Sequence, residues 1–186
     1  MVPFGILFFA KNAQIMICDK SIELQTFTHH DIQKTFEWVL NSDLQKMFLM
    51  RGKITWEGHQ RYFEELLNDS LQRIYAIQVE GQHVGNCGFK NINFTVKTGE
   101  LWIYIGEPSK QRNGIGGYGT KLLIDQGFET LGFEMIYLHV ADFNIAARRM
   151  YTKLNFTEVL LYETTEEWSR HGCNIIRMEL KRESWM

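Results

Sequence analysis

The segment Gln111-Arg-Asn-Gly114-Ile-Gly116-Gly-Tyr-Gly119 decides how this sequence is interpreted, because four glycines fall within it. It follows the strand-like stretch Glu100-Leu-Trp-Ile-Tyr-Ile105 and precedes apolar residues at helical spacing. A helix N-terminus presents unpaired N–H groups and the positive end of the helix dipole, and glycine lets an anion approach them closely. The segment therefore predicts a phosphate-binding loop, with a glycine-rich turn packed against its own domain as the alternative.

Two other phosphate-binding loops fit this segment less well. A Walker loop needs a lysine directly after its last glycine, whereas Thr120 separates Gly119 from Lys121. The glycines do satisfy the spacing GxGxxG, but residues 107–113 separate them from the end of the strand, and the dinucleotide fingerprint allows no such insertion. We therefore set both loops aside.

The hydrophobic periodicity of the rest of the chain predicts one α+β domain over residues 1–186. Residues 1–16 are interpreted as an extra strand or an overlong gene start outside the core. The order of elements indicates a largely antiparallel sheet with one parallel β-helix-β unit from 99 to 140. Strands are expected near 22–27, 74–79, 83–89, 99–106, 134–140, 157–164 and 173–181, and helices near 32–40, 56–68, 115–131 and 144–154.

Composition excludes several classes of protein. The chain of 186 residues has 20 Lys and Arg against 22 Asp and Glu, a net charge of −2, so nothing predicts a nucleic-acid partner or an anionic membrane surface. No window approaches about 18 apolar residues, so no membrane span is expected. The three cysteines are dispersed and form no metal-ligand cluster. We expect a cytoplasmic protein with reduced thiols and no metal.

Two motifs resemble those of the GCN5-related N-acetyltransferases (GNAT). Gln111-x-x-Gly114-x-Gly116 matches the family pattern [QR]xxGx[GA], and residues 144–156 resemble its NxxAxxxYxxxGF helix, with Asn155 in place of the usual glycine. The resemblance extends over roughly residues 20–182. It implies the GNAT fold: a mixed, mostly antiparallel sheet of about seven strands, splayed between strands 4 and 5 and flanked by about four helices.

The resemblance also implies a cofactor, acetyl-CoA or another short acyl-CoA, and no metal. The backbone of Tyr104 and Ile105 would pair with the amides of pantetheine, and Asn144 would hydrogen-bond the pantetheine arm. Lys110, Arg112 and Lys153 would contact the 3′-phosphate, unless they are ordinary surface charges. The loop that would hold the pyrophosphate comprises Gln111, Arg112, Asn113, Gly114, Ile115, Gly116 and Gly117.

Three residues are implied as catalytic. Tyr151 would be the general acid, because a phenol of pKa ~10 can return a proton to a thiolate of pKa ~8.5. The alternative is a core tyrosine whose hydroxyl bonds to the backbone. His139 would be the base that deprotonates the amine, with Glu100 as the competing candidate, and a buried histidine with a purely structural role is the alternative.

The first 70 residues carry a weaker resemblance. Met47, Ile54, His59, Phe63 and Leu67-Asn68 follow the pattern of bacterial nucleotide-amino-sugar N-acyltransferases, such as those of the pseudaminic-acid pathway. This similarity implies direct acyl transfer to the primary amine of a nucleotide-linked amino sugar, a small-molecule partner, and allows a homodimer. The side chains assigned to the substrate surface are Phe48, Arg51 and Trp56.

Two other functions compete with this one. A ribosomal-protein-type N-terminal acetyltransferase would share the same core and acetylate a peptide. A non-catalytic acyl-CoA-binding module would keep the glycine loop but would have no need of Tyr151.

Overall fold

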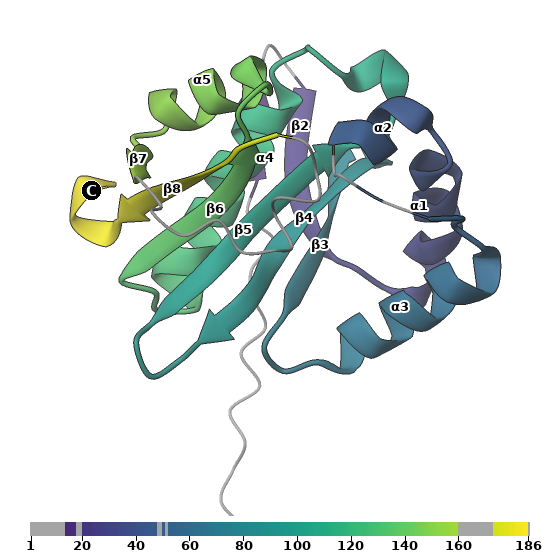
Figure 1. The fold of residues 1–186 in the computed structure, drawn as a ribbon, viewed down its shortest axis with the longest axis horizontal. Helices are drawn as coiled ribbons and strands as arrows, with labels where there is room; N and C mark the ends of the chain where they lie inside the picture. Colours follow the sequence, from purple (N-terminus) through teal and green to yellow (C-terminus); the bar gives the residue numbers. More distant parts are fainter. Residues whose placement is uncertain (1–13, 18–19, 48–49, 51, 160–172, 186) are drawn as a thin grey trace, which may run out of the picture.

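The computed structural model describes residues 14–17, 20–47, 50, 52–159 and 173–185, which form one eight-stranded sheet with helices on both faces (Figure 1). The strand order is β1-β2-β3-β4-β5-β6-β8-β7. The strands are β1 (Gln14–Ile17), β2 (Lys20–Thr26), β3 (Arg73–Val79), β4 (Gln82–Asn93), β5 (Thr98–Ile105), β6 (Met135–Ala141), β7 (Thr157–Val159) and β8 (Ile175–Lys181). The α-helices are α1 (Ile32–Val39), α2 (Ser42–Met47), α3 (Trp56–Asn68), α4 (Ile115–Asp125) and α5 (Ile145–Lys153).

This architecture confirms the expected α+β class. Strands β2 to β8 are the seven expected strands, and β1 adds an eighth at the edge of the sheet. The described helices number five rather than four because the sequence pattern missed α2. The helix expected over 115–131 is α-helical only to Asp125, continues as a π-helical turn over Gln126–Thr130, and is followed by Gly132 at φ +70°. The expected strand 157–164 is β7 as far as Val159, and its remainder lies outside the described residues.

The two central strands β5 and β6 are parallel and stay paired over only three residues. Their register joins Thr98 to Met135, Gly99 to Ile136 and Glu100 to Tyr137, and no later pair is formed. Strand β6 instead pairs along its whole length with β8, while β5 stays paired with β4 up to Ile105. The predicted splay is therefore confirmed, and it begins directly after Glu100 and Tyr137.

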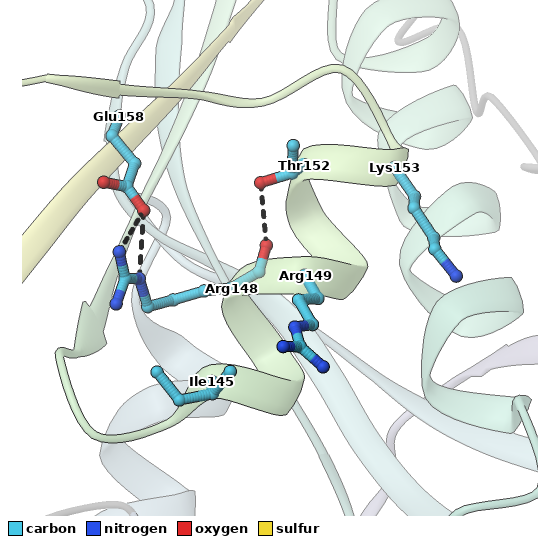
Figure 2. A pocket seen from close by; sticks show the side chains of 6 residues that line it. All are labelled: Ile145, Arg148, Arg149, Thr152, Lys153 and Glu158. Atoms are coloured by element: carbon cyan, nitrogen blue, oxygen red, sulfur yellow. Dashed lines mark hydrogen bonds and ion pairs between the residues drawn. The ribbon is translucent and has the colours of Figure 1, made fainter.

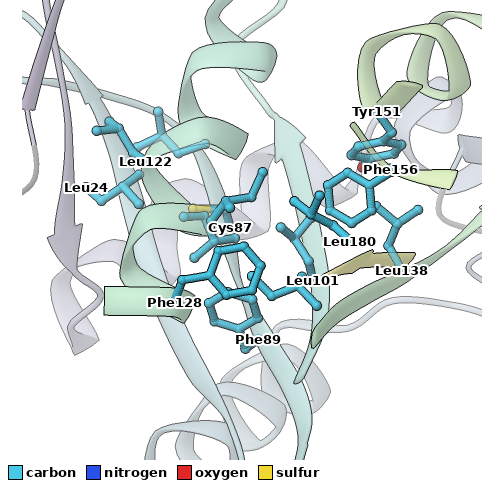
Figure 3. Close-up of a cluster of buried hydrophobic side chains, with 14 of the residues drawn as sticks. Leu24, Cys87, Phe89, Leu101, Leu122, Phe128, Leu138, Tyr151, Phe156 and Leu180 are labelled. Carbon is cyan, nitrogen blue, oxygen red and sulfur yellow. The ribbon is translucent and has the colours of Figure 1, made fainter. Parts of the chain in front are cut away.

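One face of the sheet forms the main core with α4 and α5 (Figure 3). Because side chains alternate along a strand, β5 places its odd-numbered residues on this face. Ile103 accordingly lies against Gly119 of α4, where an added Cβ would come within 3.2 Å of it. The side chains drawn in Figure 3 include Leu24, Cys87, Phe89, Leu101, Leu122, Phe128, Leu138, Tyr151, Phe156 and Leu180, all of them buried.

Helices α1 to α3 gather beside β3 and β4 and pack on the opposite face (Figure 1). Trp38 of α1 lies directly over Gly106, the residue at which β5 leaves the sheet. A Cβ built on Gly106 would fall 2.0 Å from the Trp38 ring, so only glycine fits there. This contact holds α1 against the end of β5, shortly before the glycine loop of residues 111–119.

We expect Gly106→Ala to lower the free energy of unfolding by about 1–3 kcal/mol, because the buried indole ring must move to admit a methyl group. Urea denaturation would measure the loss. The same substitution made in a Trp38→Ala background removes the clash and should cost clearly less. An equal cost in both backgrounds would show that the Trp38 contact does not constrain this position.

Candidate active site

The glycine loop has the backbone geometry of an anion-binding helix start. Gly114 is the N-cap of α4 at φ +78°, and Arg112 is also left-handed at φ +60°. The side-chain amide of Gln111 donates to the Ile105 carbonyl at 2.9 Å, and that of Asn113 donates to the Ser109 carbonyl at 3.2 Å. Gln111 thus ties the loop to the end of β5. The first intrahelical bond runs from the Tyr118 N–H to the Gly114 carbonyl, so the preceding amides face outward from the helix start.

Strand β5 directs backbone groups into the gap beside β6. The Gly106 N–H donates to the Val84 carbonyl of β4, and Tyr104 is in register with Asn86 of the same strand. Because alternate residues turn their backbone groups to opposite edges, Ile103 and Ile105 face the gap. Tyr104 was expected to share this role with Ile105, but its backbone faces β4. Its buried hydroxyl accepts a hydrogen bond from Asn86 at 2.7 Å, and burial raises the pKa of this phenol.

Helix α5 lies beside the start of α4. Met150 lies 3.8 Å from the Cβ position of Gly116 and 3.7 Å from that of Gly117. Asn144, expected to bond pantetheine, is the N-cap of α5, and its carboxamide oxygen accepts the Ala147 N–H at 3.2 Å. This leaves the carboxamide N–H groups as donors toward any ligand. Asn144 is therefore the cap of the helix that carries Tyr151 two turns further on.

Figure 2 shows the surface groove along α5. Arg148 reaches Glu158, with a guanidinium-to-carboxylate distance of 2.8 Å, whereas Arg149 and Lys153 point to the other side of the helix. Arg149 and Lys153 lie one helical turn apart on α5, and Lys110 ends the 3₁₀ turn that precedes α4. Lys153 was expected as a 3′-phosphate contact, and Arg149 is a further candidate for it that the sequence motifs did not include. The signal for it was available, because residues four apart share a helical face.

Tyr151 lies at the end of the main core, with its ring edge-on to Phe156 at a centroid distance of 5.6 Å (Figure 3). Its side chain is buried, and among the described residues its hydroxyl makes no hydrogen bond to backbone or side chain. The alternative of a core tyrosine bonded to backbone is thus not what the described residues show. Burial raises the pKa of Tyr151, so the phenol keeps its proton at neutral pH.

Glu100 and His139 meet where the splay begins. His139 Nδ1 lies 2.9 Å from Glu100 Oε1, so the two candidate bases form one pair on the face opposite Tyr151. Lys90 Nζ lies 3.2 Å from the same oxygen, and Asn91 donates to Oε2 at 2.7 Å. Burial of Glu100 acts to raise its pKa, but the His139 hydrogen bond and the Lys90 charge outweigh this, so the pKa is lowered overall. Glu100 is therefore ionised at neutral pH.

Of the three residues expected at the substrate surface, the structure describes only Trp56. Phe48 and Arg51 lie outside the described residues. Trp56 is half-buried, with its ring 5.3 Å from that of Phe36 of α1, and packs against the core beneath helices α1 and α3. The half-buried Trp102, which our sequence analysis did not single out, lies between Glu100 and Tyr104 on the same strand face. Strand alternation alone could have identified it.

Comparisons with known proteins agree with this geometry. The model of the acetyltransferase (GNAT) domain family matches residues 21–157. This chain belongs to the GNAT family. It is 27% identical to the acetyltransferase PseH of Campylobacter jejuni over 73% of this chain and 85% of that protein.

The fold is shared with proteins of known structure. The spermidine N-acetyltransferase of Vibrio cholerae, solved with CoA and spermine, has a TM-score of 0.77 at 19% identity, over 88% of this chain and 97% of that one. An uncharacterized protein from Bacillus halodurans has a TM-score of 0.78 at 12% identity, over 94% and 92% of the two chains. The GNAT protein described here is an acetyl-CoA-dependent N-acetyltransferase. Across the part of the chain that the structure describes, no helix is long and apolar enough to cross a membrane.

The described residues fit acetyl-CoA. The outward amides at the start of α4 suit a pyrophosphate, and the open edge of β5 suits the amides of a pantetheine arm, which would add to it as a strand does.

We expect Gly114→Ala to weaken CoA binding by about tenfold, because an alanine at φ +78° costs roughly 1–2 kcal/mol and turns the first amides of α4 away from their common direction. Isothermal titration with CoA measures the change. Gly132→Ala is the matched control, since φ is +70° there, no atom lies within 4 Å of the added Cβ, and the residue follows the other end of the same helical segment. Equal weakening by both variants would contradict a local role for Gly114.

Proposed function

We propose that this N-acetyltransferase moves an acetyl or other short acyl group to the primary amine of a nucleotide-linked amino sugar, by direct attack. The observation that carries the chemistry is the Glu100–His139 pair at the start of the splay. Acetyl-CoA supplies the acyl group as a thioester, and the gap between β5 and β6 gives that group a place between the two faces of the sheet. The similarity to PseH supports the substrate class.

The roles of the side chains follow from their hydrogen bonds. With the proton on Nδ1 donated to Glu100, the imidazole of His139 has its basic nitrogen at Nε2. Nε2 accepts the proton that the acceptor amine loses as the new C–N bond forms. Tyr151, on the opposite face of β6, donates its hydroxyl proton to the thiolate sulfur as the C–S bond breaks. Glu100 orients the imidazole and balances its charge after proton transfer.

The charges beside the gap suit a neutral or anionic acceptor better than a polycation. On the sheet face that carries His139, strands β5, β6 and β8 have two carboxylates, Glu100 and Glu179. Lys90 neutralises Glu100, and Arg177 donates to Glu179 at 2.6 Å. A polyamine acceptor would need unneutralised carboxylates to bind its several ammonium groups. Arg177 instead keeps its two terminal NH₂ groups unbonded within the described residues, and a phosphate oxygen could accept hydrogen bonds from them.

We expect Tyr151→Phe to lower kcat by about 10²-fold or more while the Kd of CoA stays within about twofold, because only proton donation to the thiolate is lost. Steady-state kinetics and calorimetry measure the two quantities. Tyr118→Phe, at an exposed tyrosine of α4, is the matched control and should leave kcat unchanged. Undiminished turnover in Tyr151→Phe would remove this residue from the mechanism.

The acceptor is tested by measuring thiol release from acetyl-CoA with a UDP- or dTDP-linked amino sugar, spermidine and an N-terminal peptide. We expect the highest kcat/KM with the nucleotide sugar, and Arg177→Met should raise its KM about tenfold or more without changing the Kd of CoA. Preference for the peptide would support the N-terminal acetyltransferase alternative. CoA binding without turnover of any amine would support the non-catalytic module.

A further inference from the structure

Lys90 is a charged side chain beside the active site whose role the mechanism above leaves open. It lies on β4 in register with Glu100 of β5, and its ammonium shares the Oε1 oxygen of Glu100 with the imidazole of His139. A cation and a proton-accepting group therefore lie on one carboxylate oxygen. Any proton taken up by His139 would put a second positive charge on that oxygen, close to the first.

The backbone of β4 is distorted so that two consecutive residues can reach this carboxylate. In a regular strand the side chains of Lys90 and Asn91 would point to opposite faces of the sheet. The β4–β5 register shifts after Lys90, and Asn91 adopts φ +51°, a left-handed conformation that is uncommon outside glycine. This bulge brings Asn91 to Oε2 at 2.7 Å while Lys90 stays on Oε1. The bulge in β4 thus fixes both carboxylate oxygens of Glu100, one through Lys90 and the other through Asn91.

We propose that Lys90 is a positioning residue that acts through Glu100 to keep His139 in its neutral, proton-accepting form at neutral pH. This inference rests on the proposed role of His139 as the base. Glu100 alone, as a buried carboxylate hydrogen-bonded to the imidazole, would favour the imidazolium cation, which cannot accept a proton from the amine. The Lys90 charge offsets this effect by repelling a second cation at Oε1, while the Nδ1 hydrogen bond that orients the imidazole is retained.

Within the part of the chain that the structure describes, the other charged and titratable groups near His139 do not contact the Glu100 oxygen that it shares with Lys90. Tyr137 of β6 contacts the imidazole at a ring-centroid distance of 5.8 Å, and burial raises the pKa of this phenol, so it is uncharged. On β8, Arg177 is in register with His139, but its charge is compensated by Glu179. Among the described residues, Lys90 and Glu100 are therefore the charged pair that lies directly on the imidazole hydrogen bond.

The test is the pH profile of kcat/KM for an amine acceptor in the full-length enzyme. In Lys90→Met we expect the acid limb of this profile to move to higher pH by about 0.5–1 unit, because one partly screened positive charge is removed. At alkaline pH, kcat/KM should stay within about twofold of the wild-type value. Lys90→Arg should restore the wild-type limb. Lys97→Met is the matched control, because this exposed lysine at the β4–β5 hairpin pairs with Glu134 away from the site.

Three outcomes separate this inference from the proposed function. If the acid limb of the pH profile vanishes in His139→Gln and moves in Lys90→Met, the result supports both His139 as the base and Lys90 as its positioning residue. A limb that vanishes in His139→Gln but stays fixed in Lys90→Met, or a Lys90→Met variant that loses activity equally at every pH, overturns the role of Lys90 alone. A limb that persists in His139→Gln overturns His139 as the base and the inference with it. Because any accepted amine serves as the probe, rejection of nucleotide sugars bears only on the substrate class.

Discussion

The incomplete pairing of two neighbouring strands is the constraint on which the rest of this structure depends. Parallel strands in a closed sheet satisfy each other's backbone groups, and β5 and β6 do so only as far as Glu100 and Tyr137. Beyond that point β6 is held by β8 and β5 by β4, so the gap is stable without being filled by the chain's own backbone. The open edge of β5 can therefore be completed by an extended ligand with amides of its own.

The start of α4 would form the second half of the proposed cofactor site, and its geometry is also fixed by the backbone. The chain has a net charge of −2, so anion binding cannot depend on a general positive field. It depends instead on the direction of a few amides, fixed by the left-handed turn at Gly114 and by the Gln111 side chain that ties the loop to Ile105. The helix packs through Gly119 against the odd-numbered face of β5, which sets the loop beside the gap.

Local patterns predicted the elements that carry the site but not the contacts between them. The motif around Gly114 and the helix starting at Asn144 follow from capping and periodicity, and both are where the sequence places them. The extent of the splay and the edge to which Tyr104 turns its backbone depend on strand register, which a single sequence does not fix. The sequence likewise carried no signal for the bulge that brings Lys90 and Asn91 together on Glu100, because it arises from the pairing of β4 with β5. Helix α2 is only six residues long, too short to show a helical period.

Strand β6 lies between the two groups proposed to transfer protons, Tyr151 of α5 on one face of the sheet and His139 on the other. Leu138 turns toward Tyr151 and the core (Figure 3), whereas the adjacent His139 turns to the other face, where its imidazole contacts Glu100. A thioester carbonyl held in the gap would thus have a base on the side from which the amine approaches and an acid on the side from which the thiolate departs. The base then takes a proton from the nitrogen and the acid gives one to the sulfur of the same tetrahedral intermediate, from opposite sides. This arrangement requires both substrates to be bound at once, and it favours direct transfer over a covalent acyl-enzyme, for which no nucleophilic side chain of the described strands is placed at the gap.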